Sequence, residues 1–381
     1  MKIKKIACDY LVVGAGLFGS ILAERIANEL GAKVAIIDKR PHIGGNCYSE
    51  LNPETGIEFH RYGPHIFHTS SKKAWKYINR FGKFNNYRHR VFTKYRNKIY
   101  RIPVNLETIN SFYNLNLKPR EAKEFLAKEI RKANIKNPKN LEEKAVSLMG
   151  RPLYEALVKG YTVKQWGTHP RNLPPEIISR LPVRYNHRTD YFRNARWQGI
   201  PLDDYKKIFE KMLSSSLINL VLNCDFFKER DRFDVQKKII YTGPIDQYFN
   251  YRYGKLGWRS IRLERILVKS DDYQGTSVMN YADAKIKYTR ICEPKHFHPE
   301  RTHVKGKTII FYETPKKDDN EPYYPVRTEQ NCRVYRKYRE FAWQDDGLII
   351  GGRLGDYAYY DMDKTILAAL RCFETNIKKT G

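Results

Sequence analysis

The clearest pattern of apolar and polar positions lies near the start of the chain. Two short apolar runs, residues 10–13 and 33–37, flank a stretch whose apolar residues recur at helical spacing over residues 21–30. Short apolar runs bounded by turns are typical of buried strands, and a 3.6-residue spacing is typical of a helix. The pattern therefore predicts one βαβ unit: a strand, a helix and a second strand.

The loop between the first predicted strand and the helix reads Gly14-Ala15-Gly16-Leu17-Phe18-Gly19, and the second strand ends on Asp38. Alone, GxGxxG indicates only a glycine turn. Between a strand and a helix, with an acid about 20 residues further on, it is the dinucleotide-binding fingerprint. We expect Gly14 to make the turn, Gly16 to admit a pyrophosphate, Gly19 to let the helix pack closely, and Asp38 to accept from ribose hydroxyls.

The pattern changes twice along the rest of the chain. Helical spacing recurs at residues 72–81, 119–133, 141–149 and 153–158, which predicts a helical insertion. After Pro182, short aromatic and β-branched runs alternate with Gly, Asn, Asp and Pro, which predicts an antiparallel sheet. Those runs are residues 239–242, 259–265, 277–281 and 308–312.

The end of the chain again shows a strand followed by a helix. The pattern predicts a buried strand over residues 347–353, which ends on glycines, and a helix over residues 361–378. We therefore expect the two ends of the chain to build one domain. The predicted fold class is α/β, with a discontinuous Rossmann-like dinucleotide-binding domain, an inserted helical domain and an antiparallel β-sheet domain. The approximate boundaries are 1–70, 225–260 and 335–381 for the first domain, 71–180 for the second, and 181–224 with 261–334 for the third.

The residues after Asp38 favour FAD over NAD as the dinucleotide. A basic residue, a short spacer and the pair Gly44-Gly45 follow that acid, a pattern typical of FAD-binding chains because the glycines let the backbone approach the cofactor. Alone, this pair could be a simple loop. The glycines that end the last strand are a second indication, because a helix N-terminus there would stabilise negative charge on the flavin.

Composition narrows the function classes. The formal net charge is +28, but Lys and Arg are spread over the whole length, which favours a solvated basic surface over a specific nucleic-acid interface. The six cysteines form no CxxC pair and the ten histidines show no metal-ligand spacing, so we expect no metal, no disulfide framework and a reducing cytoplasmic setting. No apolar run reaches about 18 residues, so we expect no transmembrane segment.

Nine sequence blocks then point to one family. They are residues 14–19, 39–46, 62–69, 159–167, 196–201, 241–248, 288–290, 321–325 and 351–361. In content and order they resemble the bacterial UDP-galactopyranose mutases over nearly the whole chain. That family has the three domains predicted above.

The resemblance implies an isomerase that interconverts UDP-galactopyranose and UDP-galactofuranose, with FAD that is active when reduced and no net redox change. It implies that flavin N5 attacks the anomeric carbon and displaces UDP, and that a flavin–sugar iminium then permits ring opening and reclosure. It also implies a cytoplasmic homodimer that serves cell-surface polysaccharide biosynthesis, and it does not identify the reductant.

The same resemblance assigns roles to individual residues. Arg196 and Arg290 would stabilise the departing diphosphate, because a planar guanidinium suits phosphate oxygens. Tyr205, Tyr324 and Tyr359 would donate hydrogen bonds to the diphosphate. Tyr161 would stack on uracil, and Thr162 would also bind the substrate. Trp166 would lie on a mobile loop that closes and excludes water. His65 would lie beside the flavin and the sugar, with His68 and His89 near the sugar. Asp361 would act near the sugar or cap the last helix.

The FAD-binding residues implied by the fingerprint and the resemblance share glycine turns and strand ends: Gly14, Gly16, Leu17, Phe18, Gly19, Asp38, Lys39, Gly45, Asn46, Gly243, Arg353 and Met362. The chain also departs from the family. Pro64 stands where a small residue is common, Trp197 where tyrosine is common, and His89 where asparagine is often found. These departures leave sugar specificity open, including tolerance of an N-acetyl group at C2.

Two other functions stay open on sequence alone. An FAD-dependent oxidoreductase of the amine-oxidase type would share the nucleotide fold, but it would need an electron acceptor and no pair of buried arginines. A flavin-containing RNA-modifying protein is suggested only by the charge, and RNA affinity that disappears at modest salt without sequence preference would reduce that hypothesis to nonspecific binding.

Overall fold

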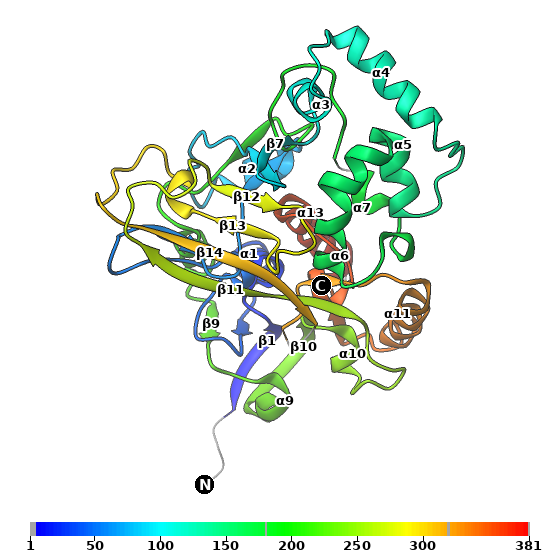
Figure 1. Ribbon diagram of the computed structural model, residues 1–381. Helices are drawn as coiled ribbons and strands as arrows, with labels where there is room; N and C mark the ends of the chain where they lie inside the picture. Colours follow the sequence, from blue (N-terminus) through cyan, green and yellow to red (C-terminus); the bar gives the residue numbers. More distant parts are fainter. Residues whose placement is uncertain (1–4, 180, 318–320, 380–381) are drawn as a thin grey trace.

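A parallel five-stranded sheet forms the nucleotide-binding part of the molecule (Figure 1). The computed structural model describes residues 5–179, 181–317 and 321–379. The strand order is β16-β10-β1-β2-β9, and every neighbouring pair is parallel. The strands are β1 (Ile6–Val13), β2 (Val34–Ile37), β9 (Ile218–Val221), β10 (Phe233–Tyr241) and β16 (Leu348–Ile350). The two ends of the chain thus meet in one sheet, as predicted.

Both faces of this sheet are covered, because successive side chains of a strand point to opposite sides. Val12 packs into a core with α1, α2, α8 and α13, whereas Leu11 packs into a second core with α9, α10 and α11. The first group of helices is α1 (Leu17–Leu30), α2 (Lys72–Ile78), α8 (Tyr205–Met212) and α13 (Met362–Cys372). The second group is α9 (Phe226–Glu229), α10 (Ile245–Tyr248) and α11 (Glu329–Ala342).

A seven-stranded sheet in the order β15-β11-β14-β13-β12-β6-β7 lies above the parallel sheet in Figure 1. It is antiparallel except at the β12–β6 pair, which is parallel. Its strands are β6 (Val91–Tyr95), β7 (Lys98–Ile102), β11 (Trp258–Val268), β12 (Val278–Tyr281), β13 (Arg290–Cys292), β14 (Thr308–Lys317) and β15 (Tyr324–Pro325). The antiparallel sheet predicted from aromatic and β-branched runs is therefore confirmed at β11, β12 and β14. The run at 239–242 is the exception, because residues 239–241 lie in β10 of the parallel sheet.

Helices between residues 106 and 179 form a layer that packs against this second sheet and shares its core (Figure 1). They are α3 (Leu106–Tyr113), α4 (Pro119–Arg131), α5 (Leu141–Tyr154), a π-helical turn (Glu155–Lys159), α6 (Gly160–Trp166) and α7 (Glu176–Ser179). The backbone of α5 breaks at Gly150, where φ is 76°. None of the helices in the described part of the chain is long and apolar enough to cross a membrane.

Further short elements lie outside these layers, including four strands, one α-helix, four 3₁₀-helical turns (Gly45–Cys47, Pro170–Asn172, Arg230–Arg232 and Pro294–Phe297) and a π-helical turn (Phe373–Ile377). Strands β3 (Ser49–Leu51) and β4 (Glu58–His60) form one small sheet, and β5 (Phe67–Thr69) and β8 (Trp197–Gly199) form another. Helix α12 (Gly352–Gly355) follows β16 directly. These pieces carry the turns that border the cavity described below.

The structure corrects the predicted domain boundaries at two places. Strand β9 pairs with β2 in the parallel sheet, although residues 181–224 were assigned to the antiparallel sheet. The hairpin β6–β7 belongs to the seven-stranded sheet, although residues 71–180 were assigned to the helical domain. Both segments are short, β9 is an incompletely buried edge strand, and charged residues interrupt the apolar pattern of the hairpin. Pairing with strands distant in sequence decides their place.

Candidate active site

One cavity of about 1410 Å³ runs along the carboxyl ends of the parallel strands and reaches α6 and the second sheet. Gly14, Asp38, Gly243 and Gly352 line it one or two positions after four of those strands. In open α/β sheets, ligands bind at this edge. Pockets for a single drug-sized ligand measure roughly 300–1,000 Å³. The cavity is therefore large enough for a dinucleotide together with a second ligand.

The glycine fingerprint packs as predicted. A Cβ atom on Gly19 would lie 2.1 Å from the carbonyl oxygen of Gly14, so only glycine lets α1 approach the turn this closely. Gly14 itself has a φ of 109°, which other residues rarely adopt. The second glycine pair lies against the first turn, because the N–H of Gly44 donates to the carbonyl of Ala15 at 2.8 Å.

Helix α1 and Asp38 provide the groups that a dinucleotide needs. The helix has Gly16 as its N-cap, with no side-chain cap and no acid in its first turn, so its first N–H groups point toward an anion site. The Asp38 carboxylate accepts the backbone N–H groups of Ala15 and Arg40, both at 2.9 Å, which fixes it beside this turn. These features fit a pyrophosphate and a ribose.

All the predicted cofactor residues line the cavity. They are Gly14, Gly16, Leu17, Phe18, Gly19, Asp38, Lys39, Gly45, Asn46, Gly243, Arg353 and Met362. Arg353 lies in α12, where its guanidinium donates to the Tyr323 carbonyl and burial lowers its pKa. Their placement agrees with the prediction, and their binding of FAD stays a prediction.

At the other end of the cavity, Arg290 of β13 meets Tyr161 of α6. Its Nη2 donates to the Tyr161 hydroxyl at 2.7 Å, and its Nε lies 3.2 Å from Oε1 of Glu313, its cross-strand neighbour on β14. Burial acts to lower the pKa of Arg290, but the Glu313 charge outweighs burial and raises it. A guanidinium carries five N–H donors, more than these two contacts use. Arg290 is thus a fixed cation at the cavity wall.

Three predicted aromatic residues gather beside this cation. The rings of Tyr324 on β15 and Tyr359 are stacked, with centroids 5.9 Å apart and an interplanar angle of 19°. The Trp166 ring lies 6.3 Å from that of Tyr324. Trp166 is the last residue of α6 and Gly167 ends the helix with a φ of 63°, so Trp166 itself lies on a helix, not on the loop where it was predicted. Thr162, on the same helix, also lines the cavity.

The predicted histidines and Asp361 line the same cavity. The His68 ring stacks on Phe192 with centroids 3.6 Å apart, and its Nε2 lies 3.8 Å from Oδ2 of Asp361. Asp361 stands at the N-cap position of α13, but its side chain accepts no capping hydrogen bond. Its carboxylate thus faces His68 and the cavity. His89 is buried with Nδ1 2.9 Å from the Tyr87 hydroxyl, and burial lowers its pKa to about 3, so its ring is neutral.

His65 is held in one tautomer. Its Nδ1 lies 2.7 Å from the carbonyl oxygen of Gly63, and since a carbonyl only accepts, Nδ1 carries the proton and Nε2 is an acceptor. Burial lowers the pKa of His65 to about 4, so the ring is neutral near pH 7. The backbone of His65 is fixed as well: its N–H donates to Nδ1 of His60 at 2.8 Å, and its carbonyl accepts from the Tyr205 hydroxyl at 2.9 Å.

Two predicted residues do not line the cavity, and their roles at the diphosphate stay predictions. Tyr205 is buried at the start of α8 and uses its hydroxyl to hold the His65 backbone. Arg196 is exposed, with its guanidinium 4.7 Å from the centre of the Trp197 ring. A family-like block gives the place of a residue in the chain, but packing against distant segments decides what its side chain contacts.

Several cavity residues were missed on sequence alone. Tyr191, Phe192 and Arg193 line the cavity only a few positions before Arg196. An aromatic pair followed by an arginine was the available signal, because such residues recur where bases and phosphates bind. Arg40 and Tyr62 also line it, with the guanidinium 4.1 Å from the ring centre. Both belong to the blocks that carried the family resemblance.

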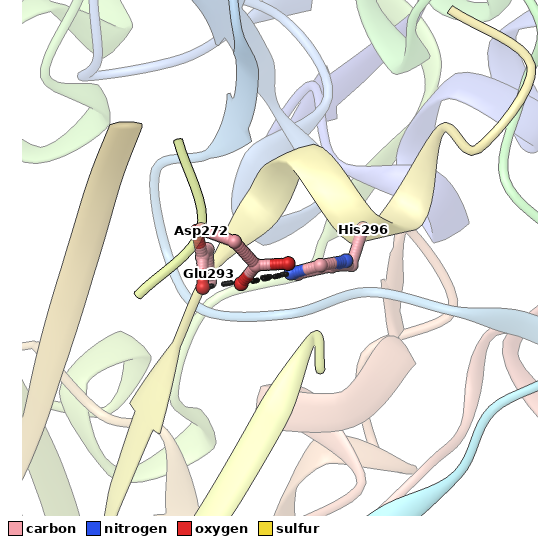
Figure 2. A group of neighbouring side chains, drawn as sticks. All are labelled: Asp272, Glu293 and His296. Carbon is pink, nitrogen blue, oxygen red and sulfur yellow. Dashed lines mark hydrogen bonds and ion pairs between the residues drawn. The ribbon is translucent and has the colours of Figure 1, made fainter. Parts of the chain in front are cut away.

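In the described ranges, one group of side chains has the spacing of a metal site, and it lies outside the cavity. Figure 2 shows Asp272, Glu293 and His296 turned toward one another. The buried Glu293 carboxylate already accepts from the N–H of Gln274 at 3.0 Å and the hydroxyl of Thr308 at 2.9 Å. The Lys295 ammonium also lies 3.8 Å from it. The group is thus part of a network of hydrogen bonds and ion pairs that ties its loops together.

Comparison with known sequence families gives two matches. The family model described as UDP-galactopyranose mutase matches residues 156–359. The model described as an NAD(P)-binding Rossmann-like domain matches residues 12–81. The second match covers the end of β1, the glycine turn, α1 and β2, where the structure places the dinucleotide fingerprint.

Individual relatives match along almost the whole chain. An Escherichia coli protein named dTDP-fucopyranose mutase is 38% identical over 97% of this chain and 98% of its own length. A Klebsiella pneumoniae protein named probable UDP-galactopyranose mutase is 39% identical over 95% of this chain and 93% of its own length. A crystal structure of reduced UDP-galactopyranose mutase shares the fold, with a TM-score of 0.71 at 15% identity over 97% of this chain and 93% of that one.

Proposed function

The chain belongs to the UDP-galactopyranose mutase family, and on that basis we propose that it interconverts UDP-galactopyranose and UDP-galactofuranose by ring contraction and expansion. The observation that carries the proposal is the single cavity that joins the dinucleotide fingerprint to Arg290, Tyr161 and Tyr324. A nucleotide sugar bound to those three residues would lie in the same cavity as a dinucleotide bound at the glycine turn.

We propose reduced FAD as the dinucleotide. The α1 N-terminus would hold the pyrophosphate, Asp38 a ribose, and the segment around Arg353 the flavin end. When bound, reduced FAD supplies the nucleophile for the anomeric carbon and is regenerated in each cycle, so no electron acceptor is needed.

The chain's own residues then act on the nucleotide sugar. Charge develops on the diphosphate as its bond to the anomeric carbon breaks, and Arg290 stabilises that charge. Because Glu313 holds the guanidinium in place and keeps it charged, no reorganisation is needed as the bond breaks. Tyr324 and Tyr359, stacked beside it, offer hydroxyl donors to the same phosphates.

The histidines bind and orient the sugar. His65 presents an unprotonated Nε2, so it accepts a hydrogen bond from a hydroxyl and does not donate a proton near pH 7. The neutral His89 has its Nδ1 engaged by Tyr87 and so offers Nε2 to the cavity. The aromatic wall of Trp166 and Tyr324 shields this end of the cavity from water, which would otherwise hydrolyse an activated sugar.

A second substrate has a specific observation in its favour. The relative named dTDP-fucopyranose mutase covers nearly all of this chain at 38% identity. The same ring contraction on dTDP-fucose differs only in groups that do not react: a 5-methyl group on the base, a deoxyribose, and a methyl group in place of the sugar CH₂OH. The diphosphate that Arg290 binds is common to both substrates.

We further propose a cytoplasmic homodimer that supplies furanose for cell-surface polysaccharides. The cysteine chemistry supports the compartment, since all six cysteines are free thiols, four of them buried. Such usage is typical of proteins kept in a reducing setting.

The test is a product assay on the purified flavoprotein. Protein reduced with dithionite is incubated with UDP-galactofuranose or with dTDP-fucofuranose, and the pyranose forms are separated by chromatography. We expect conversion with reduced protein only, and the ratio of the two rates identifies the preferred nucleotide sugar. Equal conversion by oxidised protein would refute the proposal. Bleaching of oxidised flavin by the sugar nucleotide, without ring contraction, would support the amine-oxidase alternative.

A further inference from the structure

Lys164 of α6 has an unusual environment for a lysine. Its Nζ donates to three backbone carbonyls, those of Tyr281 at 2.7 Å, Asp283 at 2.9 Å and Tyr288 at 3.0 Å. An ammonium has three N–H donors, so all of them are used. The three carbonyls belong to one segment, residues 281–288, which connects the end of β12 to the start of β13.

This contact joins the two elements that build the diphosphate end of the cavity. Residues three apart on a helix lie on the same side of it, so Lys164 and Tyr161 both face the second sheet. Lys164 contacts the segment that leads into β13, and Tyr161 contacts Arg290, the first residue of β13. Gly160 brings the helix close, because a Cβ atom there would lie 2.2 Å from the carbonyl oxygen of Ala282.

Arg259 of β11 holds the same helix from a second direction. Its guanidinium donates to the carbonyls of Gln165 at 3.2 Å and Lys164 at 3.3 Å, at the C-terminal end of α6. Two cations therefore attach α6 to the second sheet through backbone carbonyls alone. Trp166, which lines the cavity, directly follows the two residues whose carbonyls Arg259 contacts.

We infer that Lys164 is a positioning residue, which holds Tyr161 against Arg290 by tying α6 to residues 281–288 and so sets the affinity for the nucleotide. The inference rests on the proposed function, because it assigns the nucleotide to this end of the cavity. Lys164 itself does not line the cavity.

The geometry requires the charged form of Lys164. A neutral amine has two N–H donors and a lone pair, so one of the three carbonyls would face a lone pair instead of a donor. Burial lowers the pKa of Lys164 to about 8, with the nearby Asp283 charge opposing that shift. The contact therefore weakens as the pH rises through about 8, and nucleotide affinity falls with it.

Other charged or titratable groups lie on the elements packed against α6. They include Lys159 and Glu155 of the π-helical turn, Arg259 of β11, Tyr281 of β12, Asp283, Lys285, Lys287 and Tyr288 of the connecting segment, Arg290 and Cys292 of β13, and Tyr312, Glu313, Lys316 and Lys317 of β14. Burial raises the pKa of Tyr281 and of Tyr288, so both hydroxyls stay protonated through the range in which Lys164 titrates.

The test uses the FAD-loaded protein, with UDP binding measured by calorimetry from pH 7 to pH 9. Lys164→Met removes the donors, and Lys164→Arg keeps the charge without the three converging bonds. Lys159→Met is the matched control, because Lys159 precedes α6 directly but pairs with Glu155 at the surface. dTDP replaces UDP if the wild type binds it more tightly.

We expect Lys164→Met to weaken UDP binding roughly tenfold at pH 7, the effect of leaving one or more buried carbonyls unpaired. Lys159→Met binds like the wild type. Wild-type affinity falls between pH 7 and pH 9, whereas that of Lys164→Met does not change. Unaltered binding by Lys164→Met, or wild-type affinity that is constant over this range, would overturn the inference.

These outcomes do not depend on turnover. A protein that binds UDP with this pH dependence but converts no sugar keeps the role of Lys164 and loses the proposed reaction. If Lys164→Met does not fold, the pH profile of the wild type and the UDP affinity of Lys164→Arg still test the inference. A lysine that only stabilises the fold would leave the UDP affinity of the folded wild type independent of pH near 8.

Discussion

The two ends of the cavity are built in different ways. The dinucleotide end consists mainly of backbone: glycine turns, a helix N-terminus and one acid, and residues 14–46 supply most of it. The diphosphate end consists of side chains from distant segments, and the contact of Arg290 with Tyr161 spans 129 positions. The first end is specified by local spacing in the sequence. The second exists only once the sheets and helices have packed.

The largest effect is expected when the backbone of the dinucleotide end is displaced. In Gly19→Ala, the new Cβ would lie 2.1 Å from the Gly14 carbonyl oxygen, a backbone atom that cannot move aside cheaply. Overpacking of this kind costs about 1–3 kcal/mol or more, so we expect FAD occupancy to fall by roughly tenfold or more. The ratio of flavin to protein absorbance after purification measures it.

Gly31→Asn is the control for that substitution. Gly31 ends the same helix with a φ of 62° and has no atom within 4 Å of an added Cβ, and asparagine accepts this conformation. Normal flavin content in Gly19→Ala would show that close packing of α1 on the turn does not matter.

At the diphosphate end, two arginines from the family-like blocks can be compared: one lines the cavity and the other does not. Arg290→Met removes a preorganised cation, and we expect kcat to fall by about 10²–10³ with FAD still bound. Arg196→Met removes an exposed cation outside the cavity, and we expect a change below about threefold. Steady-state kinetics of both variants decide, and a large loss in Arg196→Met would support its predicted role at the diphosphate.

Tyr205→Phe tests whether the Tyr205 hydroxyl stabilises the fold or contacts the substrate. The variant leaves the carbonyl of His65 without its hydroxyl donor, so we expect a loss of about 1–2 kcal/mol in unfolding free energy. UDP affinity is expected to stay the same, because Tyr205 does not line the cavity. Denaturant unfolding and calorimetry test the two statements. Weaker UDP binding at unchanged stability would place the hydroxyl on the substrate.

The smallest effect is expected far from the cavity, at Asp272, Glu293 and His296. Burial alone would lower the pKa of His296, but the hydrogen bond and charge of Glu293 outweigh it and raise the pKa. The stabilisation is therefore complete below about pH 6.5, the unfolded value, and is lost as the pH rises through the higher folded value. We expect His296→Gln to cost up to about 1 kcal/mol at pH 5.5 and less at pH 8.5.

The pKa of Asp272 shifts in the opposite direction to that of His296. Burial would raise its pKa, but the N–H of Gly275 and the charge of His296 outweigh burial and lower it, so its contribution is lost only as the pH falls below about 4. Urea unfolding of wild type and His296→Gln at both pH values measures the difference. A larger cost at pH 8.5 would contradict the sign.

The same contrast explains how much the sequence predicts. Gly14, Gly19 and Asp38 were identified from spacing, because their roles depend on backbone geometry within one βαβ unit. Arg290 and Tyr161 were identified only through the family resemblance. Arg196, suggested by the same route, is exposed and does not line the cavity, so its role at the diphosphate stays a prediction. Strand β9 was misassigned because four residues carry too little pattern to choose between sheets.

The fate of the bond between the nucleotide and the sugar tests the proposed reaction most sharply. UDP-galactopyranose labelled with ¹⁸O at the bridging anomeric oxygen is incubated with the FAD-loaded protein, and the label is located by ³¹P NMR. If the bond between the anomeric carbon and the diphosphate breaks as proposed, the label moves to non-bridging positions of the diphosphate with reduced protein. It stays in place with oxidised protein. Ring contraction by reduced protein without any movement of the label would contradict the proposed reaction.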